Sequence, residues 1–215
     1  MDLTSSKTTA YGSDAQKARA RFKGVMRKLI KLFVIISLTI SPAIVWIFLK
    51  PVRILAPEFV SGITCISDTV CIEDLSRSSE AEQLYNEAIN FVTESVDEIK
   101  TNPRITFCSS QACFKSFGFN KSSAITIAKL GIIVSPKGWK DYYIRHEIIH
   151  HLQAERMGVI SLWQSPYWYK EGMAYFLSND PRNDLGHPLQ DYRAEFQVWY
   201  KNVGKDNLWS AGKSL

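Results

Sequence analysis

The sequence predicts an α+β fold for this 215-residue chain. Three short segments rich in Ile, Val, Thr and Phe lie near the middle of the chain, and half-buried strands have this composition. One helical pattern precedes these segments and three follow them. Because strands and helices fall in separate runs, we expect a small sheet with helices packed against it. With 46% hydrophobic residues, the chain can bury a core.

The basic character of the chain belongs to its N-terminal segment. Residues 1–31 contain eight Lys or Arg and two Asp, a net charge of +6. Residues 32–215 contain eighteen Lys or Arg and nineteen Asp or Glu, a net charge of −1. A general surface for nucleic acid on the folded part is therefore not supported.

An uncharged run of eighteen residues, Leu32 to Leu49, follows the basic segment. This length predicts a transmembrane helix at residues 32–50, with residues 1–31 as a basic cytoplasmic tail. The rest of the chain would then be extracytoplasmic in a single-pass membrane protein, and periplasmic in a Gram-negative bacterium. A cleavable signal peptide and a buried helix are the alternatives. No small-x-small cleavage site follows the run, which favours the anchor.

Four cysteines lie beyond the apolar run. Residues 51–77 read as a linker with a disulfide-closed loop, and residues 78–215 as the main domain. In an oxidising compartment the local pairs Cys65–Cys71 and Cys108–Cys113 are expected, although four cysteines allow three connectivities. A structural zinc site is the alternative, but such sites usually have closer C-x2-C spacing.

The elements of the main domain can be placed in order. Ser79 and Glu82 form a capping-box pattern for a first helix, which Asn102-Pro103 ends. The expected strands and the three later helices follow at residues 104–108, 124–129 and 131–135, then at 135–157, 165–178 and 189–201. Ser-Pro pairs open the first two of these helices, and Gly158 follows the end of the first.

The sequence His146-Glu147-Ile148-Ile149-His150 lies within an expected helix. Two histidines four residues apart share one helix face, so both imidazoles can reach one metal ion. Glu147 is offset by about 100° and would lie beside that ion, where it can take a proton from a zinc-activated water. The pattern therefore predicts a Zn²⁺ site with Glu147 as general base.

A catalytic zinc needs a third protein ligand. The metzincin pattern would place Gly at position 153 and His at position 156, where this chain has Gln153 and Arg156. Glu171 is the next candidate, because a helical return of twenty residues can bring it back to His150. Small residues at Gly172 and Ala174 would allow the two helices to approach closely around the metal.

The H-E-x-x-H pattern, with a Glu twenty residues later in W-x-x-E-G-x-A, resembles the gluzincin zinc peptidases over residues 125–178. The resemblance implies a zincin-like sheet packed on the H-E-x-x-H helix and a Glu-bearing helix. It implies His146, His150 and Glu171 as ligands, Glu147 as base, and a strand such as 131–135 that pairs with a substrate backbone. The chain departs from the family in having Tyr175 where the thermolysin branch has Asp, and in lacking the G-A-M-E-N segment.

These observations predict a membrane-anchored zinc peptidase that acts on a peptide or protein substrate. The alternatives are a membrane-tethered binding or assembly module that keeps the fold without turnover, and a purely structural domain. Among the other candidates, His151 is interpreted as a supporting or surface group. His187 is an alternative third ligand, and Tyr175 is a packing residue that can also reach an oxyanion.

Overall fold

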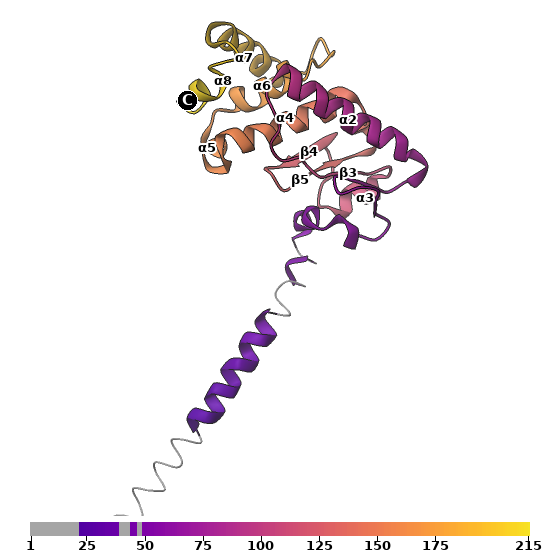
Figure 1. The fold of residues 1–215 in the computed structure, drawn as a ribbon, viewed down its shortest axis with the longest axis vertical. Helices are drawn as coiled ribbons and strands as arrows, with labels where there is room; N and C mark the ends of the chain where they lie inside the picture. Colours follow the sequence, from indigo (N-terminus) through magenta and orange to yellow (C-terminus); the bar gives the residue numbers. More distant parts are fainter. Residues whose placement is uncertain (1–21, 39–43, 47–48) are drawn as a thin grey trace, which may run out of the picture. The chain divides into compact units, whose positions relative to one another are not determined.

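The computed structural model describes residues 22–38, 44–46 and 49–215. The chain divides into two compact units, Met1–Leu49 and Lys50–Leu215. The second unit holds a five-stranded mixed sheet and a set of helices (Figure 1). The predicted α+β class is therefore confirmed.

The first unit corrects the predicted transmembrane helix. Residues 22–38 and 44–46 are helical, but no helix among the described residues is long and apolar enough to cross a membrane. The helical residues 22–38 include four Lys or Arg residues, whereas a span needs about 20 predominantly apolar residues. The prediction of a single-pass anchor at 32–50 is therefore wrong. Residues 1–21, 39–43 and 47–48 of the predicted tail and span lie outside the described residues.

The sheet has the strand order β1-β2-β3-β5-β4. Its strands are β1 (Thr64–Cys65), β2 (Val70–Ile72), β3 (Ile105–Phe107), β4 (Ala124–Ile127) and β5 (Gly131–Val134). Strands β2, β3 and β5 run parallel, while β1 and β4 pair antiparallel with their inner neighbours. Strand β5 is therefore interior, and the expectation that residues 131–135 offer a free edge is wrong. The strand at this edge of the sheet is β4, which pairs with β5.

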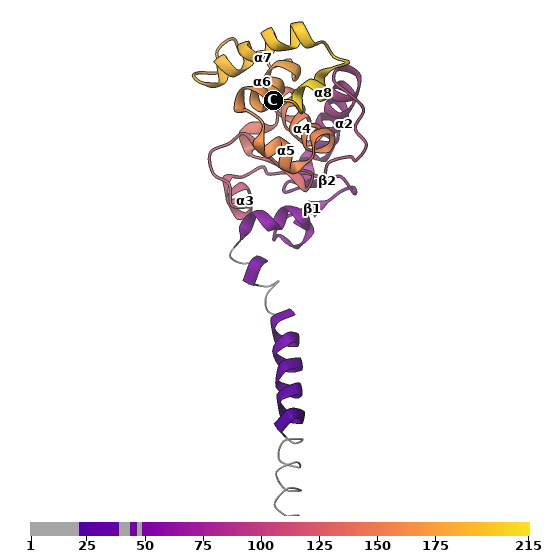
Figure 2. The same cartoon turned by 90° about the vertical axis from the view of Figure 1, so that its left-hand side faces the viewer.

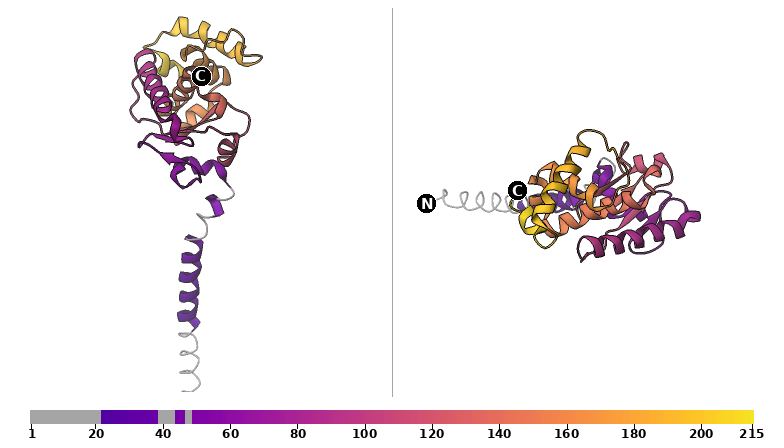
Figure 3. Two further views of the ribbon diagram at one scale, coloured as in Figure 1. Left: turned by 90° about the vertical axis from the view of Figure 1, so that its right-hand side faces the viewer. Right: turned by 90° about the horizontal axis from the view of Figure 1, so that it is seen from above.

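Helices cover the sheet in successive layers (Figures 1 and 2). Helices α2 and α4 contact the strands, α6 packs on α4, and α7 packs on α6 on the side away from the sheet. The left-hand view of Figure 3 shows the same order from the other side. The α-helices of this unit are α2 (Ser78–Ser95), α3 (Gln111–Ser116), α4 (Asp141–Met157), α5 (Val159–Gln164), α6 (Tyr167–Leu177), α7 (Leu189–Val203) and α8 (Leu208–Gly212).

Short 3-10 turns alter the predicted helix starts. The turns are η1 (Lys50–Leu55), η2 (Pro57–Phe59), η3 (Leu75–Arg77) and η4 (Pro136–Gly138). The Ser135-Pro136 pair opens η4, and α4 begins only at Asp141. The predicted capping box of α2 is not formed, because α2 begins at Ser78 and Ser79 lies inside the helix. Arg77 precedes the helix and binds Glu80 through two hydrogen bonds. Gly158, with a φ of 81°, follows the last residue of α4 as predicted.

One hydrophobic core joins the sheet to the helices. Ile105 and Phe107 of β3 belong to the same buried cluster as Val92 of α2, Ile148 of α4 and Met173 of α6. All residues of β3 and β5 are buried, as expected for strands that are covered on both faces. The central helix α4 is consequently held on several sides, which fixes the side chains that it carries.

Gly172 makes a close approach, but not the one that the sequence suggested. A Cβ atom at Gly172 would lie 2.1 Å from the Tyr192 carbonyl oxygen and 2.7 Å from the Phe196 Cβ. Both residues belong to α7, so the missing side chain brings α7 against α6 and does not shorten the distance across the predicted metal site.

Both predicted disulfides are present. Cys65 is bonded to Cys71 between the paired strands β1 and β2, and Cys108 is bonded to Cys113 at the start of α3. The four sulfur atoms are therefore not available as thiolate ligands, and the alternative of a four-cysteine zinc site is excluded.

Candidate metal centre

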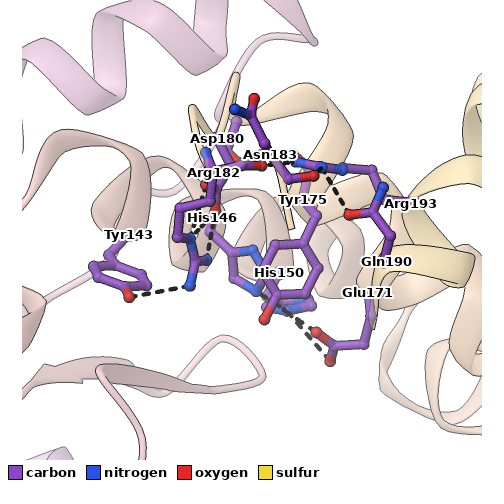
Figure 4. A network of polar contacts seen from close by, with 11 residues as sticks. Tyr143, His146, His150, Glu171, Tyr175, Asp180, Arg182, Asn183, Gln190 and Arg193 are labelled. Atoms are coloured by element: carbon purple, nitrogen blue, oxygen red, sulfur yellow. Dashed lines mark hydrogen bonds and ion pairs between the residues drawn. The ribbon is translucent and has the colours of Figure 1, made fainter. Parts of the chain in front are cut away.

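Helices α4 and α6 bring the three predicted ligands together. His146 Nε2 and His150 Nε2 are 3.1 Å apart. Each lies 3.6 Å from one oxygen of the Glu171 carboxylate, Oε2 for His146 and Oε1 for His150. Figure 4 shows both imidazoles directed at this carboxylate. The side chains thus converge from two helices on one point.

These separations fit the donor set of a zinc ion. Ligands at about 2.0–2.1 Å around a tetrahedral ion are separated from one another by about 3.3 Å. The observed separations of 3.1 and 3.6 Å lie on either side of that value. Two neutral imidazoles and one carboxylate are also the ligand set of many catalytic zinc sites. The residues present therefore fit a divalent metal ion.

The electrostatics of the metal-free cluster favour a cation at this point. Burial disfavours the charged form of His150, but the Glu171 carboxylate more than compensates and raises the pKa of His150 to about 9. Burial also opposes the charge on Glu171, yet the His146 and His150 imidazoles beside it hold its pKa well below the usual range. A metal binding here would displace the proton from His150.

Glu147 lies beside the cluster and is held by the edge strand. Its side chain is buried among α4 and β4. The Thr126 hydroxyl oxygen of β4 lies 2.6 Å from Glu147 Oε2 and 2.9 Å from the Glu147 carbonyl oxygen. The Thr126 hydroxyl has one proton to donate, and it forms its stronger hydrogen bond with the carboxylate of Glu147. Thr126 therefore fixes the direction of the predicted base.

The loop after α6 places an arginine at the site. Arg182 binds the buried Asp180 carboxylate, and its Nη1 donates to the Tyr143 hydroxyl at 3.2 Å (Figure 4). The hydrogen bonds with Asp180 raise the pKa of Arg182, so the guanidinium stays charged.

The Tyr175 ring packs on His146 with ring centroids 4.3 Å apart. Burial raises the pKa of Tyr175 to about 12, which keeps its hydroxyl a proton donor.

A cavity of about 580 Å³ opens over the three ligands. Its walls come from the segment 121–128 around β4, from α4 and α6, and from Arg182. Tyr143, Glu147 and Tyr175 line it together with the ligands. Residues of β4 therefore form part of the cavity wall.

Other predicted candidates lie away from this cavity. His151 is fully buried, not at the surface, and its Nε2 lies 2.7 Å from the Thr101 carbonyl oxygen, so it ties α4 to the loop between α2 and β3. His187 is exposed and pairs with Asp191. A second group of ligand-type residues, Glu73 with Cys108 and Cys113, includes a disulfide and offers no thiolate.

Several site residues were not predicted from the sequence. Thr126, Gln153, Asp180 and Arg182 all lie within the cavity wall or directly behind it. In the sequence Gln153 marks only a departure from the metzincin pattern, although its position three residues after His150 places it on the same helix face. Thr126 and Arg182 gave no such local signal, because the fold brings them to the site from distant segments.

No family model, no curated protein and no solved structure matches the chain.

Proposed function

We propose that this chain is a zinc-dependent hydrolase of the zincin type that cleaves peptide bonds. The convergence of His146, His150 and Glu171 on one point, with the Glu147 carboxylate beside it, is the observation that supports this proposal most directly. The spacing of these residues resembles that of gluzincins, and the separations between the donor atoms suit zinc.

The arrangement of the chain's own residues suits peptide hydrolysis. A zinc ion at this site would lower the pKa of water toward neutrality and polarise a carbonyl group. Glu147, oriented by Thr126, accepts the proton of the attacking water and returns it to the leaving nitrogen. Tyr175 lines the cavity as a proton donor and is placed to stabilise a developing oxyanion.

The edge strand supports a peptide as the substrate. Strand β4 is the last strand of the sheet, and its residues line the cavity beside the base. An extended peptide can add to such an edge by main-chain hydrogen bonds, which place successive carbonyl groups along the cavity. This edge selects an extended backbone over a compact small molecule.

Metal analysis and turnover of the full chain test this proposal. We expect about one zinc per chain in the wild type, with metal lost in Glu171→Ala because two imidazoles remain. Glu147→Gln should keep the metal and lose cleavage of a peptide library by about 100-fold or more, since it cannot accept a proton. His187→Ala is the matched control and should change neither result.

Two outcomes would contradict the proposal. Absence of zinc from the wild type would favour a structural domain. Zinc bound with no cleavage of any library peptide would favour a binding module that uses the same cluster.

A further inference from the structure

Gln153 links the two helices that carry the candidate ligands. It is fully buried on α4, three residues after His150. Its Oε1 lies 2.8 Å from His150 Nδ1, and its Nε2 donates to the Lys170 carbonyl oxygen of α6 at 2.9 Å. Lys170 directly precedes Glu171, so one amide group contacts both ligand-bearing segments.

These contacts determine how the amide of Gln153 is oriented. A backbone carbonyl can only accept, so the amide nitrogen of Gln153 must face Lys170. The amide oxygen then faces His150 and can only accept in turn. His150 must therefore carry its proton on Nδ1.

The tautomer of His150 decides whether it can bind a metal. With the proton on Nδ1, the neutral ring keeps a lone pair on Nε2. That nitrogen is the atom directed at His146 and Glu171. The α6 backbone thus selects, through Gln153, the form of His150 that donates to a metal.

The two histidines differ in this respect. His146 Nδ1 is buried and has no hydrogen-bond partner among the described residues. Its ring is held by packing on Tyr175. His150 is therefore the ligand whose ring is oriented by a hydrogen bond at Nδ1.

We infer that Gln153 is the positioning residue of the metal site, which holds His150 in the metal-binding tautomer and sets α6, with Glu171, at the correct distance. This inference rests on the proposed zinc site. It assigns to Gln153 no contact with substrate. Outer hydrogen-bond partners of metal-bound histidines typically contribute about 10–100-fold to metal affinity.

Zinc competition with a chromophoric chelator, on the full-length chain, tests the inference. Gln153→Met keeps the volume but removes both hydrogen bonds, and we expect zinc affinity to fall about 10–100-fold. Gln153→Glu keeps an acceptor for His150 Nδ1 and should bind zinc more tightly than the Met variant. Gln83→Met, on the exposed surface of α2, is the control and should bind as the wild type does.

A second readout separates positioning from general stability. The Co²⁺-loaded chains should show altered d–d bands in Gln153→Met and unaltered bands in Gln83→Met, because the bands report ligand geometry. The unfolding temperature of each metal-free variant shows whether it still folds. If Gln153→Met does not fold, Gln153→Glu decides: it loses the donor to the Lys170 carbonyl, so zinc affinity and Co²⁺ bands equal to those of the wild type contradict the inference.

The outcomes distinguish the two claims. A wild type that binds zinc while Gln153→Met binds it equally tightly overturns the assignment of Gln153 alone. A lower unfolding temperature with unchanged zinc affinity overturns it in the same way. A wild type that binds no zinc overturns both the proposed function and this inference.

Discussion

At the scale of single residues, the candidate base depends on a neighbour from another element. Glu147 projects from α4, but the hydroxyl that orients it belongs to Thr126 of the edge strand. The strand that lines the cavity thus also fixes the direction of the proton acceptor. A peptide bound along β4 would lie next to a carboxylate that is already oriented.

Removal of the Thr126 hydroxyl should slow turnover without loss of metal. Thr126→Val keeps the shape of the side chain, and we expect kcat to fall about 10-fold, since a hydrogen bond to a charged group contributes about 1.5–3 kcal/mol. KM and zinc content should stay near those of the wild type. Thr126→Ser, which retains the hydroxyl, should recover most of the rate. An unchanged kcat in the Val variant would exclude the role given to Thr126.

The sequence predicts only those site residues that follow a known spacing along the chain. His146, Glu147 and His150 follow from a four-residue spacing, and Glu171 from the distance that a helical return covers. Thr126 lies twenty-one residues before the base it binds, and Arg182 lies in a loop after α6. Contacts of this kind depend on tertiary packing, so no local pattern predicts them.

At the scale of elements, the position of Glu171 depends on how α6 is held between two other helices. One face of α6 meets α4 through the Gln153 contact, and Gly172 meets α7 on the other. A ligand at the centre of this three-helix layer therefore responds to changes on either side of it.

A methyl group at Gly172 should force α6 and α7 apart. In Gly172→Ala the new Cβ meets a backbone oxygen at 2.1 Å, which rotation of a side chain cannot relieve. We expect a loss of about 1–3 kcal/mol in the free energy of unfolding, and a lower unfolding temperature by calorimetry. Gly24→Ala is the control, because nothing lies within 4 Å of that position. Equal unfolding temperatures for both variants would show that α7 can move away from α6 without a loss of stability.

The sequence predicted the long helix α7 and the short strands β3, β4 and β5 at their observed places, but it did not predict β1 and β2. The expected helix at 189–201 corresponds to α7, because its apolar positions recur over several turns. Strand β1 has two residues and β2 has three, so their period is too short to be read from the sequence. The edge position of β4 was missed for another reason, since strand order depends on which segments pair.

At the scale of the whole molecule, charge is distributed unevenly. The net charge of +5 derives from the first 31 residues, while the rest of the chain is nearly neutral. The cavity is nonetheless lined by Lys121, Lys170 and Arg182. Asp180 balances Arg182, and the proposed metal ion would balance the Glu147 and Glu171 carboxylates, so Lys121 and Lys170 are the uncompensated charges among the described lining residues.

Acidic peptides should be the better substrates if the proposed activity holds. We expect higher kcat/KM for peptides with Asp or Glu near the cleaved bond than for matched peptides with Lys, and a smaller difference at high salt. Lys170→Glu should reduce or reverse this preference. Lys201→Glu, an exposed change on α7, is the charge-matched control. Equal rates for both peptide series in the wild type would contradict the expectation.

Composition alone misled the prediction at the N-terminus. An uncharged run of eighteen residues has nearly the length of a membrane span. In the part of the chain that the structure describes, residues 22–38 are helical and include four Lys or Arg residues, and no described helix is long and apolar enough to cross a membrane. An uncharged run of this length is therefore not sufficient to predict a membrane-spanning helix.

The free edge of β4 also bears on self-association. An unpaired strand edge can accept a second copy of the same strand as readily as a ligand. The exposed residues Lys121 and Lys129 lie on either side of β4. Antiparallel pairing of two such edges would bring lysines of one copy toward lysines of the other, and facing like charges are destabilising. Lys121 and Lys129 thus disfavour pairing of β4 with a second copy of the chain, while the edge can still pair with an extended peptide.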